Sequence, residues 1–213
     1  MHDRNRYPAA LGILAGVVAL VAFAALGWGC GPQDSVEDAA AAQEMGIPKP
    51  AFNAAGELMR PVGYREWVYV GAPLTPNELN PPEAPFPEFH NVYIHPGDYA
   101  HYRRTGQFRD GTVVVKELVS VASKQAASGN GYFMGEFIGL EAAVKDTRRF
   151  PDEPYNWGYF SFGHVPEAEY AATAAALPTD ACAACHVANA AEDMVFTQYY
   201  PVLRAAKAHP GTR

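Results

Sequence analysis

The sequence predicts a mainly β domain of the α+β class, in which an antiparallel β-sheet precedes a C-terminal helical segment. Two observations carry this prediction. Segments rich in β-branched and aromatic residues fill the middle of the chain, and, apart from one short helix, helical composition follows only after residue 166. A chain of 213 residues that is 49% hydrophobic also has enough apolar material for one packed domain.

The first 30 residues predict a signal peptide or an N-terminal membrane anchor. Arg4 and Arg6 precede residues 9–28, which carry no charge and are rich in Ala, Val and Leu. The apolar region of a cleavable signal spans about 7–15 residues, so this longer run also suits a membrane-spanning anchor. Cys30 follows the run, where a bacterial lipoprotein carries its lipidated cysteine; otherwise it leaves with the signal or stays in the anchor. We therefore expect a periplasmic domain.

Residues 31–51 are predicted to be a flexible linker, and residues 52–213 the folded domain. The linker is rich in alanine and acidic side chains and has few residues able to fill a core. The whole chain has 23 acidic and 16 basic residues and no basic block. This balance argues against a nucleic-acid partner, and membrane contact is expected only through the N-terminus.

The first half of the domain alternates strand-like segments with proline and glycine. Aromatic and β-branched residues predict strands over 64–71 and 89–94, and the prolines between 73 and 87 exclude an interior helix or a central strand there. Proline at its start, arginines near its end and a final glycine predict a short helix over 96–106.

A β-hairpin is predicted next. Residues 112–122 hold five valines and a leucine, and the turn at 128–131 leads into a strand over 132–138. Aromatic residues predict a further strand over 157–162. Helices are then predicted over 167–177, around 179–186 and over 202–209.

The motif Cys182-Ala183-Ala184-Cys185-His186 matches the attachment pattern of a c-type haem. In this pattern two thiols add to the porphyrin vinyl groups and the adjoining histidine binds the iron. Residues three apart share one face of a helical turn, so both sulfurs meet the macrocycle edge while His186 points towards its centre. We predict one haem c, attached through Cys182 and Cys185, with His186 as an axial iron ligand.

Three other roles compete for Cys182 and Cys185: a thioredoxin-like redox pair, half of a zinc site, and a structural disulfide. The redox role needs a βαβ context and zinc needs two more ligands at close spacing, and the sequence favours neither. The sixth iron position decides function, because a strong ligand there makes an electron carrier whereas an open position binds small molecules. A methionine ligand would come from Met45, Met59, Met134 or Met194, and none of these is favoured by its position.

Lys116 interrupts an apolar face in the middle of a predicted strand. With a period of two, Val114, Lys116 and Leu118 share one face. The ordinary explanation is an edge strand with its lysine ammonium in water. The alternative is a desolvated lysine whose amine is nucleophilic towards an adjacent electrophile.

Several separate motifs, all in the same order, closely resemble the cytochrome P-460 family. The resemblance extends over about residues 52–207. The motifs are YREWV at 64–68, TPNELN at 75–80, FRDGTVVVKELV at 108–119, GNGYFMG at 129–135, CAACH at 182–186 and DMVFTQYYPVL at 193–203.

The resemblance implies a mostly β homodimeric cytochrome with a five-coordinate haem. A lysine bonded to a meso carbon of the porphyrin ties this haem to the protein a third time, and the matching position is Lys116. The resemblance also implies oxidation of hydroxylamine to nitrous oxide or nitric oxide, with nitric oxide as a co-substrate in some conditions. A periplasmic acceptor such as a small cytochrome c would take the electrons.

Two other functions remain open beside that enzyme. A related branch of the same fold, the β-type cytochromes c-prime, lacks the cross-link and binds nitric oxide. The other alternative is a simple electron-transfer cytochrome c with a distal methionine.

The resemblance also implies phenylalanines that crowd the distal face of the haem. Phe86 and Phe89 are candidates, and core packing is the other explanation for either. Some family members use a distal carboxylate, for which Glu117, Glu136 and Glu141 are possible sources. His90, His101 and His164 are possible proton shuttles, although surface or core positions are the ordinary explanation for all six.

Overall fold

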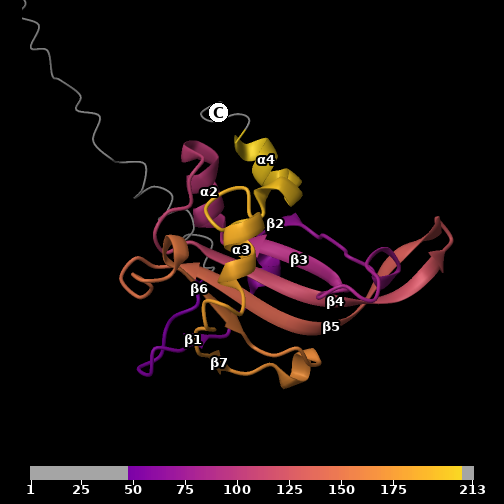
Figure 1. The fold of residues 1–213 in the computed structure, drawn as a ribbon, viewed down its shortest axis with the longest axis horizontal. Coiled ribbons are helices and arrows are strands. Elements are labelled where there is room, and N and C mark those ends of the chain that lie inside the picture. The colour runs from indigo at the N-terminus through magenta and orange to yellow at the C-terminus, as the bar shows by residue number, and fades with distance from the viewer. Residues whose placement is uncertain (1–47, 208–213) are drawn as a thin grey trace, which may run out of the picture. The chain divides into compact units, whose positions relative to one another are not determined.

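The computed structural model describes residues 48–207 (Figure 1). The predicted signal or anchor, Cys30, Met45 and residues 31–47 of the predicted linker lie outside the described residues, as do the last six residues of the chain. Within 48–207, no helix has both the length and the apolar composition that crossing a membrane requires.

The domain is built on a five-stranded antiparallel sheet with the order β2-β3-β4-β5-β6, which confirms the predicted α+β class. Its strands are β2 (Val68–Gly71), β3 (Phe89–Ile94), β4 (Val113–Ala126), β5 (Gly129–Lys145) and β6 (Trp157–Ser161). A small second sheet pairs β1 (Leu58–Met59) with β7 (Thr173–Ala174). The α-helices are α2 (Pro96–Thr105), α3 (Ala183–Asn189) and α4 (Pro201–Lys207). Short 3-10 turns are η1 (Tyr64–Glu66), η2 (Asn77–Leu79), η3 (Pro154–Asn156), η4 (Glu167–Glu169) and η5 (Thr197–Tyr199).

The β4–β5 hairpin is longer than the sequence predicts. Ala126 pairs with Gly129, so the turn is tighter than the predicted 128–131 and both strands continue to it. The register shifts repeatedly beyond Leu118, and such bulges bend a strand pair and increase its twist. The far end of the hairpin accordingly leaves the sheet and projects beyond it (Figure 1), with residues 122–130 exposed.

Two apolar cores lie on opposite faces of the five-stranded sheet. On one face, Val92, Ile94 and Tyr159 pack with residues of α2, α3 and α4, and we call this the helix face. On the opposite face, Val115, Ala142 and Phe160 pack with the segments that contain β1, η1 and β7. The period of two along each strand explains this division, because neighbouring residues point to different faces.

One predicted helix is wrong and one predicted strand is shortened. Residues 167–177 form only η4 and then an extended segment, since the Ala172 carbonyl accepts a hydrogen bond from the Arg60 N–H and β7 pairs with β1. The alanine run has no apolar stripe that would anchor a helix, and strand pairing satisfies its backbone instead. In the predicted strand over 64–71, the 3-10 turn η1 replaces the first residues and β2 begins at Val68.

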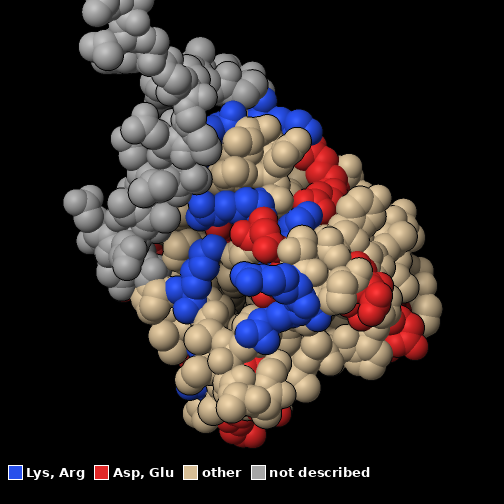
Figure 2. All heavy atoms as spheres, turned by 90° about the vertical axis from the view of Figure 1, so that its left-hand side faces the viewer, with Lys and Arg blue, Asp and Glu red and all other residues tan. Residues whose placement is uncertain are grey.

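The helix α2 confirms its predicted limits and carries a buried carboxylate. Gly106 ends the helix with φ of 70°, a left-handed conformation that glycine adopts without steric cost. Asp98 is fully buried and accepts hydrogen bonds from the Lys49 ammonium, the Arg109 guanidinium and the Val113 N–H. Lys49 thereby joins the start of the described chain to α2, and it also donates to the Gly111 carbonyl in the turn before β4. Basic side chains gather on one side of the domain with acidic ones among them (Figure 2).

Candidate haem site

Three rows of paired residues cross the helix face of the sheet and locate the predicted site. The first row is His90, Leu118 and Gly139; the second is Val92, Lys116, Glu141 and Ser161; the third is Ile94, Val114, Ala143 and Tyr159. Successive rows are about 6–7 Å apart along the strands. Because Lys116 is in the middle row, residues of the first and third rows lie on either side of it.

The predicted iron ligand His186 lies on α3, against the third row. Its ring is held between the rings of Tyr159 and Phe196, each with its centroid 4.6 Å from that of the imidazole. The Nδ1 atom is 2.5 Å from the Met194 carbonyl oxygen. A carbonyl accepts only from a protonated nitrogen, so Nδ1 carries the hydrogen and Nε2 keeps the lone pair. Burial also lowers the pKa of His186, which favours the neutral ring that binds a metal.

A strained loop supplies that carbonyl. Asp193 and Met194 have φ angles of 44° and 65°, in the left-handed region that costs non-glycine residues of order 1 kcal/mol each. The loop is fixed from the sheet, because Lys145 Nζ lies 2.7 and 2.6 Å from the two Asp193 carboxylate oxygens and Trp157 Nε1 donates to Oδ1 at 3.3 Å. These contacts hold the Met194 carbonyl against His186.

The two predicted attachment cysteines are free thiols at the start of α3. Cys182 is partly buried and Cys185 is exposed, and no disulfide joins them. Burial raises the pKa of Cys182, and Glu141 raises it further. Beside them, the Tyr159 hydroxyl is buried and has no hydrogen-bond partner among the described residues, although buried polar atoms are normally paired. Free thiols, an available imidazole Nε2 and an orphaned hydroxyl together fit a bound haem better than a closed protein core.

Lys116 lies on a central strand, so the edge-strand explanation of this lysine is wrong. β4 pairs with β3 on one side and β5 on the other. The Lys116 ammonium is 2.6 Å from Glu141 and lies over the Phe86 ring, 4.4 Å from its centroid. Lys116 and Glu141 also act electrostatically on both Cys182 and His186. Strand register therefore brings Lys116 to the residues of the CAACH motif from more than sixty residues away.

The other predicted distal residues divide between the two faces. Phe86 lies by Lys116, whereas the alternation of β3 puts Phe89 on the opposite face with Asn91 and Tyr93. Glu141 is the carboxylate beside Lys116. Glu117 lies on the opposite face, where it accepts hydrogen bonds from Tyr64 and Arg65.

The three methionines of the described residues lie on the hairpin, in the helix-face core and in β1. Met134 is on the hairpin with 47% of its surface exposed, and its sulfur accepts a hydrogen bond from Asn91 at 3.8 Å. The Met194 side chain is buried in the core of the helix face. Its backbone carbonyl contacts His186 at Nδ1, the ring nitrogen that does not face the iron in the predicted site. Met59 is in β1.

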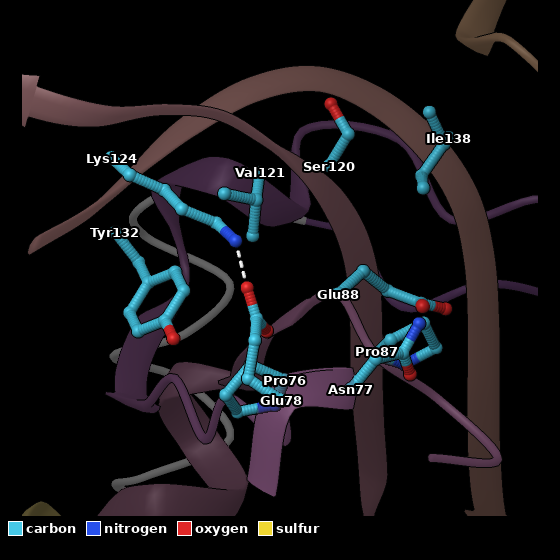
Figure 3. A pocket seen from close by; sticks show the side chains of 10 residues that line it. All are labelled: Pro76, Asn77, Glu78, Pro87, Glu88, Ser120, Val121, Lys124, Tyr132 and Ile138. Atoms are coloured by element: carbon cyan, nitrogen blue, oxygen red, sulfur yellow. Dashed lines mark ion pairs between the residues drawn. The ribbon is translucent and has the colours of Figure 1, made fainter. Parts of the chain in front are cut away.

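The sequence did not single out Glu88, which the structure places at the edge of this site. Its carboxylate is buried and lies 2.9 Å from His164 Nε2. The His164 ring in turn covers Gly139, where any Cβ would come within 2.9 Å of the ring. Glu88 also lines a cavity of about 340 Å³ under the hairpin (Figure 3). Lys124 and Glu78 line the same cavity and form an ion pair that does not include Glu88. Neither Glu88 nor His164 stands in a local motif, so only the fold reveals that pair.

A sequence profile of the cytochrome P460 family matches residues 61–197. The chain belongs to the cytochrome P460 family. Membership confirms the resemblance found in the sequence and identifies the chain as a c-type haem protein with an iron centre, in a family of haem oxidoreductases. Among curated proteins, none matches the sequence. Cys182, Cys185 and His186 remain the predicted haem-binding residues, and Lys116 lies on the sheet face against which His186 packs.

Proposed function

We propose that this member of the cytochrome P460 family oxidises hydroxylamine to nitrous oxide or nitric oxide, with or without nitric oxide as co-substrate. One observation carries the proposal. A lysine on a central strand, Lys116, lies on the same sheet face as His186 and one row away from the Tyr159 ring on which His186 packs. A lysine in this place is suited to become the third attachment of the haem.

The chain's own residues would orient the substrate and take its protons. When bound, the haem supplies an iron centre that accepts electrons from the substrate. His186 would be the protein ligand of that iron. Glu141 is the carboxylate beside Lys116 and is placed to accept a proton. Phe86 would restrict the space beside Lys116.

The activity is tested with the purified haem-loaded protein and an artificial electron acceptor. We expect hydroxylamine to be consumed and the acceptor reduced, with nitrous oxide or nitric oxide detected by gas analysis. The matched control is Lys116→Met, which keeps Cys182, Cys185 and His186 and should lose most of the turnover. Absence of turnover in the unaltered protein would refute the proposal.

A second candidate is a nitric oxide binding protein without this catalysis. It is favoured by the Lys116–Glu141 ion pair, because a lysine held as an ammonium is not a nucleophile. Mass spectrometry of tryptic peptides separates the two. A Lys116 peptide joined to the haem peptide supports the enzyme, and a free Lys116 peptide supports the binding protein.

The proposed setting follows from the N-terminus and from the family. We propose that the domain is periplasmic, that its N-terminus is cleaved, lipidated at Cys30 or retained as an anchor, and that two copies form a homodimer. A small periplasmic cytochrome c would be the electron acceptor. Purification with and without detergent tests the anchor, and sedimentation tests the dimer.

A further inference from the structure

His90 is a half-buried imidazole of the first row that the proposed reaction leaves unused. Its Nε2 atom is buried and has no hydrogen-bond partner among the described residues. The backbone of Phe86 favours the protonated ring and so raises the pKa of His90. In a neutral imidazole one nitrogen carries the hydrogen and the other accepts, and the unpartnered Nε2 is the atom placed to accept a proton.

Burial and the charge of Lys116 both make His90 less basic. The Phe86 ring contacts both groups, edge-to-face with His90 at 5.8 Å and under the Lys116 ammonium at 4.4 Å. The titratable groups that face His90 are Lys116 on β4, Glu141 on β5, and His164 after β6 with its partner Glu88. Burial, and then the Lys116 ammonium, lower the pKa of His90 to about 4, while Glu141 acts in the opposite direction.

We infer that His90 is a second proton acceptor for the proposed reaction, and that it gains this capacity when Lys116 loses its positive charge. The inference rests on the proposed function. In the step, an N–H or O–H bond of the substrate breaks, its proton moves to Nε2, and the bonding electrons stay on the substrate. The Lys116 charge is lost when its nitrogen bonds to a porphyrin carbon. That bond replaces one C–H and two N–H bonds of the ammonium, releases three protons, and passes two electrons to an oxidant such as a peroxide.

The test uses the haem-loaded protein with carbon monoxide bound to the reduced iron. The infrared C–O stretching frequency responds to protonation of a nearby imidazole, so its change with pH reports the His90 midpoint without any turnover. Lys116→Met and Lys116→Arg form a matched pair, because both lack the cross-link and only the second keeps the positive charge. We expect the midpoint in Lys116→Met to lie at least about one pH unit above that in Lys116→Arg, with the cross-linked protein resembling Lys116→Met.

Two further variants identify the titrating group. His90→Gln should abolish the transition, and His164→Gln, an exposed histidine whose ring covers Gly139 of that row, should retain it. A transition that persists in His90→Gln, or equal midpoints in the two Lys116 variants, overturns the inference even if hydroxylamine is oxidised. Different midpoints in a protein that does not oxidise hydroxylamine would instead refute the proposed reaction and leave the coupling of His90 to Lys116 standing.

Discussion

At the scale of single residues, the site depends on groups that orient other groups. His186 is fixed by two rings and a carbonyl, and the carbonyl is fixed by Asp193 through Lys145 and Trp157. Such outer contacts set the orientation of a metal-binding histidine and raise its basicity. The strained backbone at Asp193 and Met194 is the cost of this arrangement.

The first prediction concerns Asp193→Asn. This change removes the charged partner of Lys145 and loosens the loop that holds the Met194 carbonyl. We expect the haem reduction potential to rise, because a less firmly bonded Nδ1–H makes His186 a weaker electron donor, and the free energy of unfolding to fall by about 1 kcal/mol. A spectroscopic redox titration measures the first effect and urea unfolding the second. Asp152→Asn, at an exposed position, is the control, and an unchanged potential in Asp193→Asn would contradict the assigned role.

The second prediction concerns Gly139→Ala. A Cβ at this position would lie 2.7 Å from a Leu118 methyl group and 2.9 Å from the His164 ring, so both must move or the backbone must shift. We expect a loss of about 1–3 kcal/mol in the free energy of unfolding. Gly131→Ala, on the same strand with its nearest neighbour at 3.8 Å, should cost much less. Equal losses in urea unfolding would show that the His164 ring is free to move away.

At the scale of elements, sequence signals sufficed where the determinants were local. Pro96 and Gly106 frame α2, and the valines of residues 113–121 mark β4, so both elements were predictable. Residues 167–177 were not, because their extended form depends on pairing with β1, more than a hundred residues away. Local alanine content favours a helix, and the distant backbone partner overrides it.

The site was predictable to the extent that it consists of motifs. CAACH indicates the attachment residues, and the break in the strand pattern indicates Lys116. The support around them comes from strand register and loop geometry, which leave no local sequence signal. Glu88, Asp193 and the alignment of His90 with Gly139 therefore required the structure.

The third prediction concerns β4, where Glu117 is the neighbour of Lys116 on the opposite face. Its buried carboxylate accepts hydrogen bonds from the Tyr64 hydroxyl at 2.6 Å and from Arg65 at 2.6 and 2.9 Å. Glu117→Gln removes the charge that pairs with Arg65, whose side chain is 41% exposed and is therefore partly rehydrated. We expect a loss of about 2 kcal/mol in the free energy of unfolding, measured by urea, and no change in the haem spectrum. The exposed Glu66→Gln is the control; an altered haem spectrum in Glu117→Gln would show that the two faces are coupled.

At the scale of the described domain, one sheet separates a face for chemistry from a face for stability. The helix face carries the CAACH helix, Lys116 and the imidazoles, whereas the opposite face is closed by a continuous apolar core with Phe160, Phe162 and Leu58. The helix-face elements are short: α3 has 7 residues, and the loop after it is held by a few polar contacts. Helices of this length are marginal alone, so the bound haem should contribute much of their stability.

The fourth prediction tests this division by hydrogen–deuterium exchange of haem-loaded and haem-free protein. The haem-free form is made as Cys182→Ala with Cys185→Ala. We expect the amides of α3 and of the loop with Asp193 to exchange much faster without haem, because opening these segments no longer requires breaking contacts with the haem. The Leu58–Ala174 and Met59–Thr173 pairs on the opposite face should exchange at similar rates in both forms, since their core does not include the predicted haem residues. An equal increase in exchange on both faces would contradict this division. It would mean that the whole sheet opens as one unit when the haem is absent, and that the opposite face is not stable without it.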